Sequence, residues 1–205
     1  MKVNRIFCIG RNYAEHIKEL GNASDEACVV FMKPASCVVP PGAPLVLPRG
    51  RGSVHHEAEV VVRLGGGGAG IPVERALESV AAITLGLDLT LRELQNQLKG
   101  KGAPWELCKA FDGAAPLGEW TAHHGQDLQA LAFSCEVNGV TRQSGNTKDM
   151  LFPVARVIHI LSQTWALADG DVIYTGTPAG VGPLVPGDRV AVTGAGLGRF
   201  EWRCE

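Results

Sequence analysis

Short runs of β-branched and aliphatic residues, separated by glycine and proline, dominate the pattern of hydrophobic positions along the chain. The sequence of 205 residues contains 26 glycines and 12 prolines. Apolar runs bounded by such turn residues are typical of strands, whereas helices repeat their apolar positions every three to four residues. We therefore expect strands at 5–9, 53–64, 80–87, 134–137, 140–143, 172–175 and 189–193. The pattern predicts an α+β protein that is mainly β, with short flanking helices.

Turn and capping residues refine this picture. Asn138-Gly139 between two strand-like runs predicts a β-hairpin with a type I′ turn. Asn12 is suited to cap a short helix that ends at Gly21. Thr90 and Glu93 have the spacing of a capping box. The expected helices are 13–20, 73–77, 90–100 and 153–161, and the last carries its apolar residues on one stripe.

Two acidic residues lie inside the apolar strand predicted at 53–64. Glu57 and Glu59 are separated by one residue and are followed by Val60-Val61-Val62. Side chains of a strand alternate between its faces, so both carboxylates should point to the same side. Two like charges held together among apolar residues are costly unless a positive group neutralises them.

Asp88 ends the apolar run at 80–87 and could supply a third carboxylate. A set of ligands made only of oxygen atoms suits a hard divalent cation, Mg²⁺ or Mn²⁺. Three protein ligands on an octahedral ion would leave coordination positions for a substrate. Surface carboxylates on an edge strand are the alternative, but the flanking sequence is too apolar for a solvated edge. We therefore favour the metal site.

Composition excludes several classes of protein. The formal net charge is −2 and no run of basic residues occurs, so neither nucleic acid nor an anionic membrane is expected as a partner. The six cysteines include no CxxC pair, which is typical of reduced thiols in a cytoplasmic protein. The N-terminal segment is too interrupted for a signal peptide. We expect a single domain spanning 1–205, located in the cytoplasm.

A glycine-rich segment offers a competing interpretation. Residues 65–70 satisfy the pattern GxGxxG, follow a predicted strand, and have Asp88 at the distance of a ribose-binding acid. The preceding strand carries Glu57 and Glu59, however, whereas the central strand of a dinucleotide fold is almost continuously apolar. A hairpin loop is the better interpretation, and a Rossmann fold is kept as the minor alternative.

Ordered motifs along nearly the whole chain, residues 5–203, resemble the fumarylacetoacetate hydrolase family and most closely its acylpyruvase branch. The matching stretches are Gly10-Arg11-Asn12-Tyr13-Ala14-Glu15-His16, Phe31-Met32-Lys33-Pro34, His55-His56-Glu57-Ala58-Glu59, Leu87-Asp88-Leu89-Thr90, Gly102-Ala103-Pro104-Trp105, Lys109-Ala110-Phe111-Asp112 and the segment 175–182. The resemblance implies a mixed β-sandwich roll, a homodimer, bound Mg²⁺ or Mn²⁺, and a small 2-oxo acid as substrate.

The family's functional residues carry over to matching positions. The resemblance implies metal ligation by Glu57, Glu59 and Asp88, and a general base, His16, paired with Glu19 on a lid helix at about 12–21. Residues three apart on a helix share a face, which independently allows this pairing. Lys109 is implied as the lysine that contacts the substrate carboxylate or an oxyanion. The other expected substrate contacts are Arg11, Tyr13, Arg92, Gln95 and Thr177, with Asn12 beside them.

The expected function is Mg²⁺-dependent hydrolysis of acylpyruvates, such as acetylpyruvate or fumarylpyruvate, to pyruvate and a carboxylic acid. Oxaloacetate decarboxylation, and hydration, isomerisation or decarboxylation of 2-oxo-alkenoates from aromatic degradation, are alternatives because they use the same enolate. A nucleotide- or metal-binding module without catalysis is the alternative of another class. His55 or His56 is expected to support the metal strand, and His123, His124 and His159 have no expected role.

Overall fold

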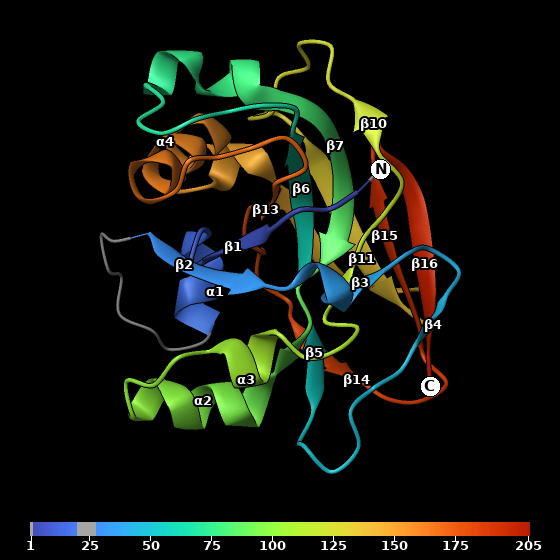
Figure 1. Ribbon diagram of the computed structural model, residues 1–205. Coiled ribbons are helices and arrows are strands. Elements are labelled where there is room, and N and C mark those ends of the chain that lie inside the picture. The colour runs from blue at the N-terminus through green and yellow to red at the C-terminus, as the bar shows by residue number, and fades with distance from the viewer. Residues whose placement is uncertain (1, 20–27) are drawn as a thin grey trace.

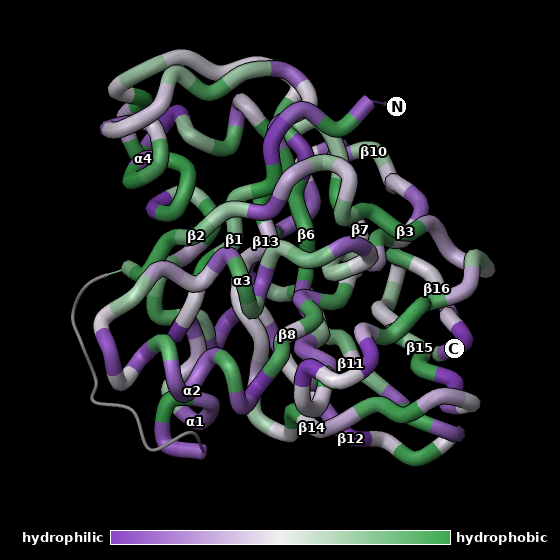
Figure 2. The backbone as a smooth tube through the Cα atoms, turned by 60° about the horizontal axis from the view of Figure 1, so that its bottom comes forward, coloured by the Kyte–Doolittle hydropathy of each residue, from purple (hydrophilic) through white to green (hydrophobic). Residues whose placement is uncertain are grey.

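Six strands form the largest sheet of the computed structural model, which describes residues 2–19 and 28–205. In spatial order they are β10 (Thr121–Ala122), β7 (Val80–Leu87), β6 (Ala58–Leu64), β13 (Val172–Tyr174), β1 (Ile6–Gly10) and β2 (Val29–Lys33). Strands β1 and β13 run parallel, and the other neighbours are antiparallel. Every residue of β6 is buried, so this strand forms the centre of the core. Figure 2 shows much of this strand in green, the colour of hydrophobic residues.

A second sheet packs against β6 and β7 through β11 and β15. Its strands, in spatial order, are β12 (Val140–Asn146), β11 (Ala132–Val137), β15 (Arg189–Gly194), β16 (Gly198–Cys204) and β4 (Pro44–Leu45). One face of each sheet carries apolar side chains, so stacking the two faces removes both from water. The predicted mainly β fold with mixed sheets is confirmed (Figure 1).

Two small sheets and several short helices complete the described structure. The sheets are β14 (Gly182–Leu184) with β5 (Val54–His56) and β8 (Thr90–Leu91), and β3 (Val38–Val39) with β9 (Ala115–Pro116). The α-helices are α1 (Ala14–Glu19), α2 (Arg92–Gly100), α3 (Glu106–Lys109) and α4 (Val154–Thr164). The 3₁₀ helices are η1 (Ala35–Cys37), η2 (Val73–Ser79) and η3 (Thr147–Asp149).

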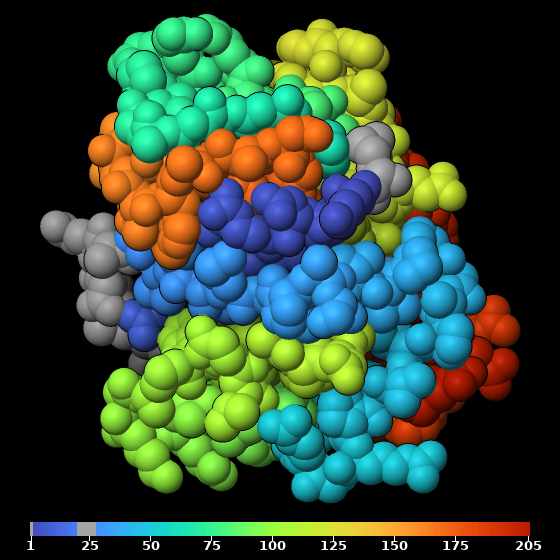
Figure 3. Space-filling model, viewed as in Figure 1, coloured from blue at the N-terminus to red at the C-terminus, as the bar shows by residue number. Residues whose placement is uncertain are grey.

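Helices α4 and η2 lie near one end of the long strands β6 and β7, and helices α2 and α3 lie near the other end (Figure 1). Helix α4 packs on η2, whereas α2 and α3 pack on each other and on the strands near the opposite end. Figure 3, in the view of Figure 1, shows the α4 segment in orange on one side of the N-terminal strand and the α2–α3 segment in yellow-green on the other. In the described part of the chain, no helix has the length and hydropathy of a transmembrane segment.

Two local predictions are confirmed. Asn138 and Gly139 have φ values of 53° and 77°, so both adopt the left-handed conformation that a type I′ turn requires. They join β11 to β12, as expected for a hairpin. Helix α4 follows Pro153 directly, and the apolar stripe that was predicted to face the core is buried.

The predicted strand at 53–64 is wrong in one respect, because it is interrupted at Glu57. Strand β5 pairs with β8 and β14 in one small sheet, whereas β6 belongs to the large sheet. Glu57 lies at the junction, where the chain passes from one sheet to the other. The carboxylates therefore converge at a break between two sheets rather than on one uninterrupted strand.

The predicted capping box is also wrong. Thr90 pairs with His55 in the β5–β8 ladder, and its hydroxyl donates to the carbonyl of Asp88, 3.1 Å away. Helix α2 begins at Arg92 without a side-chain cap. The carboxylate of Glu93 instead accepts hydrogen bonds from the backbone and hydroxyl of Ser53, both at 2.8 Å. Sheet pairing has taken the place of the local cap.

Asn12 does not act as the predicted helix cap. Its amide donates to the carbonyls of Phe152 and Thr175, and its oxygen accepts from the backbone N–H of Phe152 at 2.7 Å. The residue therefore fastens the start of α1 to two distant segments. The predicted C-terminal end of this helix, at Leu20 and Gly21, lies outside the described residues.

The Rossmann alternative is excluded by topology. Strands β6 and β7, which flank the glycine-rich segment 65–70, are antiparallel neighbours. A dinucleotide-binding unit requires two parallel strands joined by a crossover helix. The segment is instead part of the connection between antiparallel strands, as the hairpin interpretation predicted.

Candidate metal centre and active site

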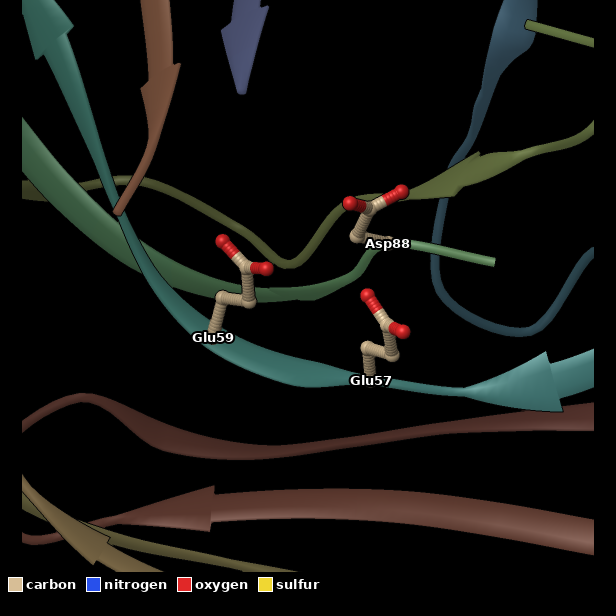
Figure 4. A group of neighbouring side chains, drawn as sticks. All are labelled: Glu57, Glu59 and Asp88. Carbon is tan, nitrogen blue, oxygen red and sulfur yellow. The ribbon is translucent and has the colours of Figure 1, made fainter. Parts of the chain in front are cut away.

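Three buried carboxylates converge at the junction between the sheets. Glu57 lies immediately before β6, Glu59 is the second residue of β6, and Asp88 follows β7, the antiparallel neighbour of β6. The backbone N–H of Asp88 donates to the carbonyl of Glu57 at 2.8 Å, which fixes the two chains side by side. One oxygen from each carboxylate lies within 4.8 Å of the others. Figure 4 shows the three side chains gathered at this place. The predicted triad is thus brought together.

Positive side chains neutralise two of these carboxylates. The ammonium of Lys109 lies 2.7 Å from an oxygen of Glu57 and 2.7 Å from an oxygen of Asp88. Arg92 forms a second ion pair with Glu57. Burial by itself favours the neutral acid, but Lys109 and Arg92 hold the pKa of Glu57 well below its usual range. Glu57 is therefore ionised.

Lys109 is buried and charged. Burial by itself lowers the pKa of a lysine, but the carboxylates of Asp88 and Glu57 more than reverse this, so the pKa of Lys109 is raised. The sequence predicted a lysine that contacts substrate. The structure places its ammonium against the carboxylates of Glu57 and Asp88.

Lys33 was missed as a site residue. Its ammonium lies 2.8 Å from Asp88 and also donates to the carbonyl of Lys109. The sequence did contain a signal, because a lysine at the end of the apolar run Val29–Lys33 is unusual unless its charge is compensated. Lys33 fixes both Asp88 and the backbone from which Lys109 extends.

Glu59 lacks the compensation that its neighbours have. Its carboxylate accepts a 2.7 Å hydrogen bond from the backbone of Gly176. Among residues 2–19 and 28–205, no lysine, arginine or histidine nitrogen lies within ion-pair distance of it. Burial, and then the nearby charge of Asp88, raises the pKa of Glu59 well above its usual value. A divalent cation would supply the missing positive charge, so this set of hard oxygen donors fits Mg²⁺ or Mn²⁺.

His16 and Glu19 form the predicted pair on α1. The Nδ1 atom of His16 lies 3.1 Å from one oxygen of Glu19, and the other oxygen accepts a 2.9 Å hydrogen bond from the backbone of Gly180. Burial lowers the pKa of His16, while Glu57 and Glu19 oppose this shift only in part. The imidazole is therefore neutral near pH 7, as a general base must be.

The loop from Thr175 to Gly182 depends on glycine at two positions. Gly176 has a φ of 104°, and an added Cβ would lie 2.6 Å from Cβ of Asn12. Gly180 has a φ of 97°, and an added Cβ would collide with the carbonyl of Arg142. Gly176 thereby approaches Asn12 closely and donates to Glu59 of β6, and Gly180 packs against Arg142 and donates to Glu19 of α1.

Thr177 does not have the freedom that the sequence prediction assumed. Its hydroxyl donates to the carbonyl of Ala58 at 2.8 Å and accepts from Gln143 at 2.7 Å. The proton that was expected to reach a substrate carboxylate is already used within the protein. Thr177 lines the cavity, and its contacts hold the loop against the start of β6.

One cavity brings most of the predicted residues together. Its charged and polar lining consists of Arg11, His16, Glu57, Glu59, Asp88, Arg92, Gln95, Lys99, Lys109 and Thr177. Its free volume is about 20 Å³, which accommodates roughly one water molecule. The described side chains therefore leave too little space for a substrate, so some of them would have to move to admit one.

Tyr13 lies elsewhere. It lines a second cavity with Asp149 and Pro178, on the other side of the start of α1. Burial raises the pKa of its hydroxyl, with further contributions from Glu59 and Asp149. His159, for which no role was expected, has its Nδ1 atom 2.7 Å from the carbonyl of Ile71 and so joins α4 to the segment before η2.

Gln143 connects the second sheet to the site, and no sequence signal indicated this. Its side-chain oxygen accepts from the backbone of Ala58 at 3.0 Å and lies 3.0 Å from Nδ1 of His56. Its nitrogen donates to Thr177 and to the carbonyl of Pro178. His56 thus supports the metal strand through Gln143. Gln143 belongs to β12, which the sequence predicted only as half of a hairpin.

Replacing Gln143 with leucine is expected to lower the free energy of unfolding by about 3 kcal/mol, because several buried polar groups lose their partners. Urea denaturation of the apoprotein measures this change. Gln97→Leu, at an exposed position of α2, is the matched control and should have little effect. Equal stability of the two variants would contradict the structural role of Gln143.

Comparison with known proteins agrees with this geometry. The family model described as "Fumarylacetoacetate (FAA) hydrolase C-terminal" matches residues 5–204. The chain is 42% identical to oxaloacetate tautomerase YcgM of Escherichia coli over 193 residues, which are 93% of this chain and 88% of that protein. It is 39% identical to the mitochondrial oxaloacetate tautomerase FAHD1 of Mus musculus over 186 residues, 90% of this chain and 84% of that protein.

A solved structure is also similar. Fumarylpyruvate hydrolase from Pseudomonas aeruginosa, crystallised in complex with Mn²⁺ and pyruvate, matches with a TM-score of 0.94 at 38% identity. The match covers 98% of this chain and 89% of that chain. The named relatives are enzymes with isomerase-type or hydrolase activity. The extent of the family match, together with the converging acidic triad, shows that the chain belongs to the fumarylacetoacetate hydrolase family.

Proposed function

We propose that the protein is a divalent-metal-dependent enzyme that interconverts the enol and keto forms of oxaloacetate. The convergence of Glu57, Glu59 and Asp88 beside Lys109 and Arg92 carries this proposal. It is a site that combines hard ligands for a cation with fixed positive charge for an anionic substrate. The tautomerases of E. coli and mouse support oxaloacetate as the substrate.

The three carboxylates would hold Mg²⁺ or Mn²⁺. When bound, the ion would act as a Lewis acid that stabilises the negative charge developing on the oxygen of a 2-oxo acid. Arg92 and Gln95, one turn apart on α2, line the cavity and are hydrogen-bonded to each other, and in this proposal they would bind a substrate carboxylate. As the proposed lid, α1 would exclude bulk water from the reacting atoms when it covers a bound substrate, which would strengthen these electrostatic contacts.

Tautomerisation moves one proton between carbon C3 and the oxygen on C2. Neutral His16 can accept the C3 proton, and Glu19 stabilises the imidazolium that results. Lys109, held as an ammonium, can donate a proton to the C2 oxygen. Each such conversion leaves His16 protonated and Lys109 neutral, so a proton must pass from the imidazolium to the amine, through solvent, before the next turnover. The reverse direction starts from the opposite protonation states of the same two groups.

Hydrolysis of acylpyruvates, the function expected from the sequence, is the second candidate. The His16–Glu19 pair favours it, because an oriented neutral histidine could also activate a water molecule for attack on the distal carbonyl. The hydrolase from P. aeruginosa, which was crystallised with Mn²⁺ and pyruvate, supports it further. Both candidates pass through the enolate of a 2-oxo acid.

A substrate panel separates the two candidates. Enol loss from oxaloacetate is followed by ultraviolet absorbance, and pyruvate release is followed from acetylpyruvate, fumarylpyruvate and oxaloacetate, with Mg²⁺, Mn²⁺ or EDTA. We expect rapid, EDTA-sensitive tautomerisation with slower release of pyruvate. Pyruvate release from an acylpyruvate without tautomerisation would favour the second candidate. Activity that is unaffected by EDTA would overturn both.

The homodimer, the cytoplasmic location and the use of Mg²⁺ in the cell are part of the same proposal. The mouse relative is named as mitochondrial, so the compartment requires its own experiment. Sedimentation measures the state of association, and comparison of turnover with Mg²⁺ and Mn²⁺ measures the metal preference.

A further inference from the structure

Lys99 extends the polar face of α2 into the cavity. Arg92, Gln95 and Lys99 occupy positions i, i+3 and i+7 of the helix, which place side chains on one face. All three line the cavity that contains the carboxylate triad. Arg92 and Gln95 are among the substrate contacts expected from the sequence, whereas Lys99 is not. Lys101, just beyond the helix, is exposed and provides a comparison.

The side chain of Lys99 is held in place rather than extended into solvent. Its ammonium lies 5.4 Å from the centre of the Trp105 ring. Trp105 lines the same cavity and packs on Phe31, with 5.6 Å between the ring centres. An ammonium over an aromatic face is attracted to the ring, and the stem of the lysine packs on apolar surface. Lys99 is therefore fixed at the wall of the cavity.

The charges around Lys99 indicate what it would bind. In the described part of the chain, no carboxylate oxygen lies within ion-pair distance of its ammonium. Burial lowers its pKa to about 8, and Arg92 and Arg11 contribute further. With Arg11 set aside, the cavity lining carries three cations (Arg92, Lys99, Lys109) and three carboxylates, a formal sum of zero that a divalent cation would raise to +2. Such a site favours a ligand with more than one negative charge.

Position along the helix indicates where this second charge would lie. Arg92 pairs with Glu57 at the carboxylate triad. Lys99 follows seven residues later, which is about 10 Å further along the helix axis. Because the long side chain of Lys99 nevertheless lines the same cavity as the triad, a ligand whose 2-oxo acid end lies at the triad would present its other end to that ammonium.

We infer that Lys99 is a specificity-determining residue that binds the distal carboxylate of a dicarboxylic 2-oxo acid. This inference rests on the proposed function, because it assumes that the 2-oxo acid end lies at the triad. It predicts preference for dianions such as oxaloacetate or fumarylpyruvate over the monoanion acetylpyruvate. The preference arises because a monoanion leaves the ammonium of Lys99 without a partner.

The test measures binding to the Mn²⁺-loaded protein by calorimetry, with two probes that differ at the distal end. The dicarboxylic probe is 3,3-difluorooxaloacetate, which cannot enolise, and the monocarboxylic probe is pyruvate. Lys99→Met keeps the stem on Trp105 and removes the charge. We expect the dissociation constant for the dicarboxylic probe to rise about 10- to 100-fold, the range of a charge-assisted hydrogen bond. Pyruvate should change by less than about twofold.

Two further variants complete the experiment. Lys101→Met removes a charge of the same sign at an exposed position and should change neither probe. Lys99→Arg should restore most of the selectivity. An equal loss for both probes in Lys99→Met, or wild-type protein that binds the two probes equally well, would overturn the inference. If wild-type protein with Mn²⁺ binds neither probe, the proposed function itself fails.

Discussion

Replacing Glu59 with glutamine is expected to lower metal-dependent turnover on the order of 10³-fold. Glu59 is the member of the triad without a described cationic partner, so its charge is the one that an ion would compensate. The amide has nearly the same shape and removes that charge. Glu57→Gln would be less informative, since it would also leave Arg92 and Lys109 without a partner.

Thermal denaturation with and without MnCl₂ separates metal binding from folding. At a metal concentration 100 times the dissociation constant, wild-type protein gains about 2.7 kcal/mol. That gain corresponds to a rise in Tm of roughly 5–11 °C for a domain of this size. Glu59→Gln should unfold normally in EDTA and lose this rise. Glu74→Gln, at an exposed position of η2, should keep it. A normal metal response in Glu59→Gln would remove Glu59 from the metal site.

Replacing His16 with glutamine is expected to lower kcat/KM by about 10²–10⁴-fold, the usual contribution of a general base. The pH profile of the wild-type enzyme gives an independent check. Burial lowers the pKa of His16, so the neutral base persists below the ordinary histidine value of about 6.5. The decline of kcat/KM on the acid side of the profile, its acid limb, should therefore have its midpoint below pH 6.5. A bound cation would offset the charge of Glu57, one of the groups that raise this pKa, and would move the limb lower still.

The binding properties of His16→Gln distinguish a base from a structural residue. Because His16 is not among the three carboxylates, the variant should bind Mn²⁺ and oxalate with nearly wild-type affinity. It should also lose the acid limb that the wild-type enzyme shows. An unchanged limb in the variant would assign that titration to another group, and wild-type turnover would show that another group acts as the base.

The sequence predicted the large sheet and the triad for the same reason. Apolar runs such as the residues of β6 must be buried, and acidic residues within them must be compensated. That argument led to Glu57, Glu59 and Asp88 without knowledge of the chain path. His16 and Lys109 required the family resemblance, because a histidine or lysine near an apolar segment is common in proteins without a site.

What could not be predicted depends on contacts between distant segments. The capping box at Thr90 is a local pattern, and it failed because His55, 35 positions earlier, pairs with Thr90 in a sheet. Gln143 reaches the site only because β12 lies beside the loop that follows β13. Neither contact leaves a trace in the residues next to it.

Glu19 uses its two oxygens for different tasks, one toward the imidazole of His16 and one toward the backbone of Gly180. Because His16 and Glu19 both lie on α1, an outward movement of this helix would break the contact with Gly180 and would carry the paired imidazole away from the carboxylate triad. A substrate that remained at the triad would then have no proton acceptor beside it. The hydrogen bond between Gly180 and Glu19 would thus couple proton transfer by His16 to the position of α1.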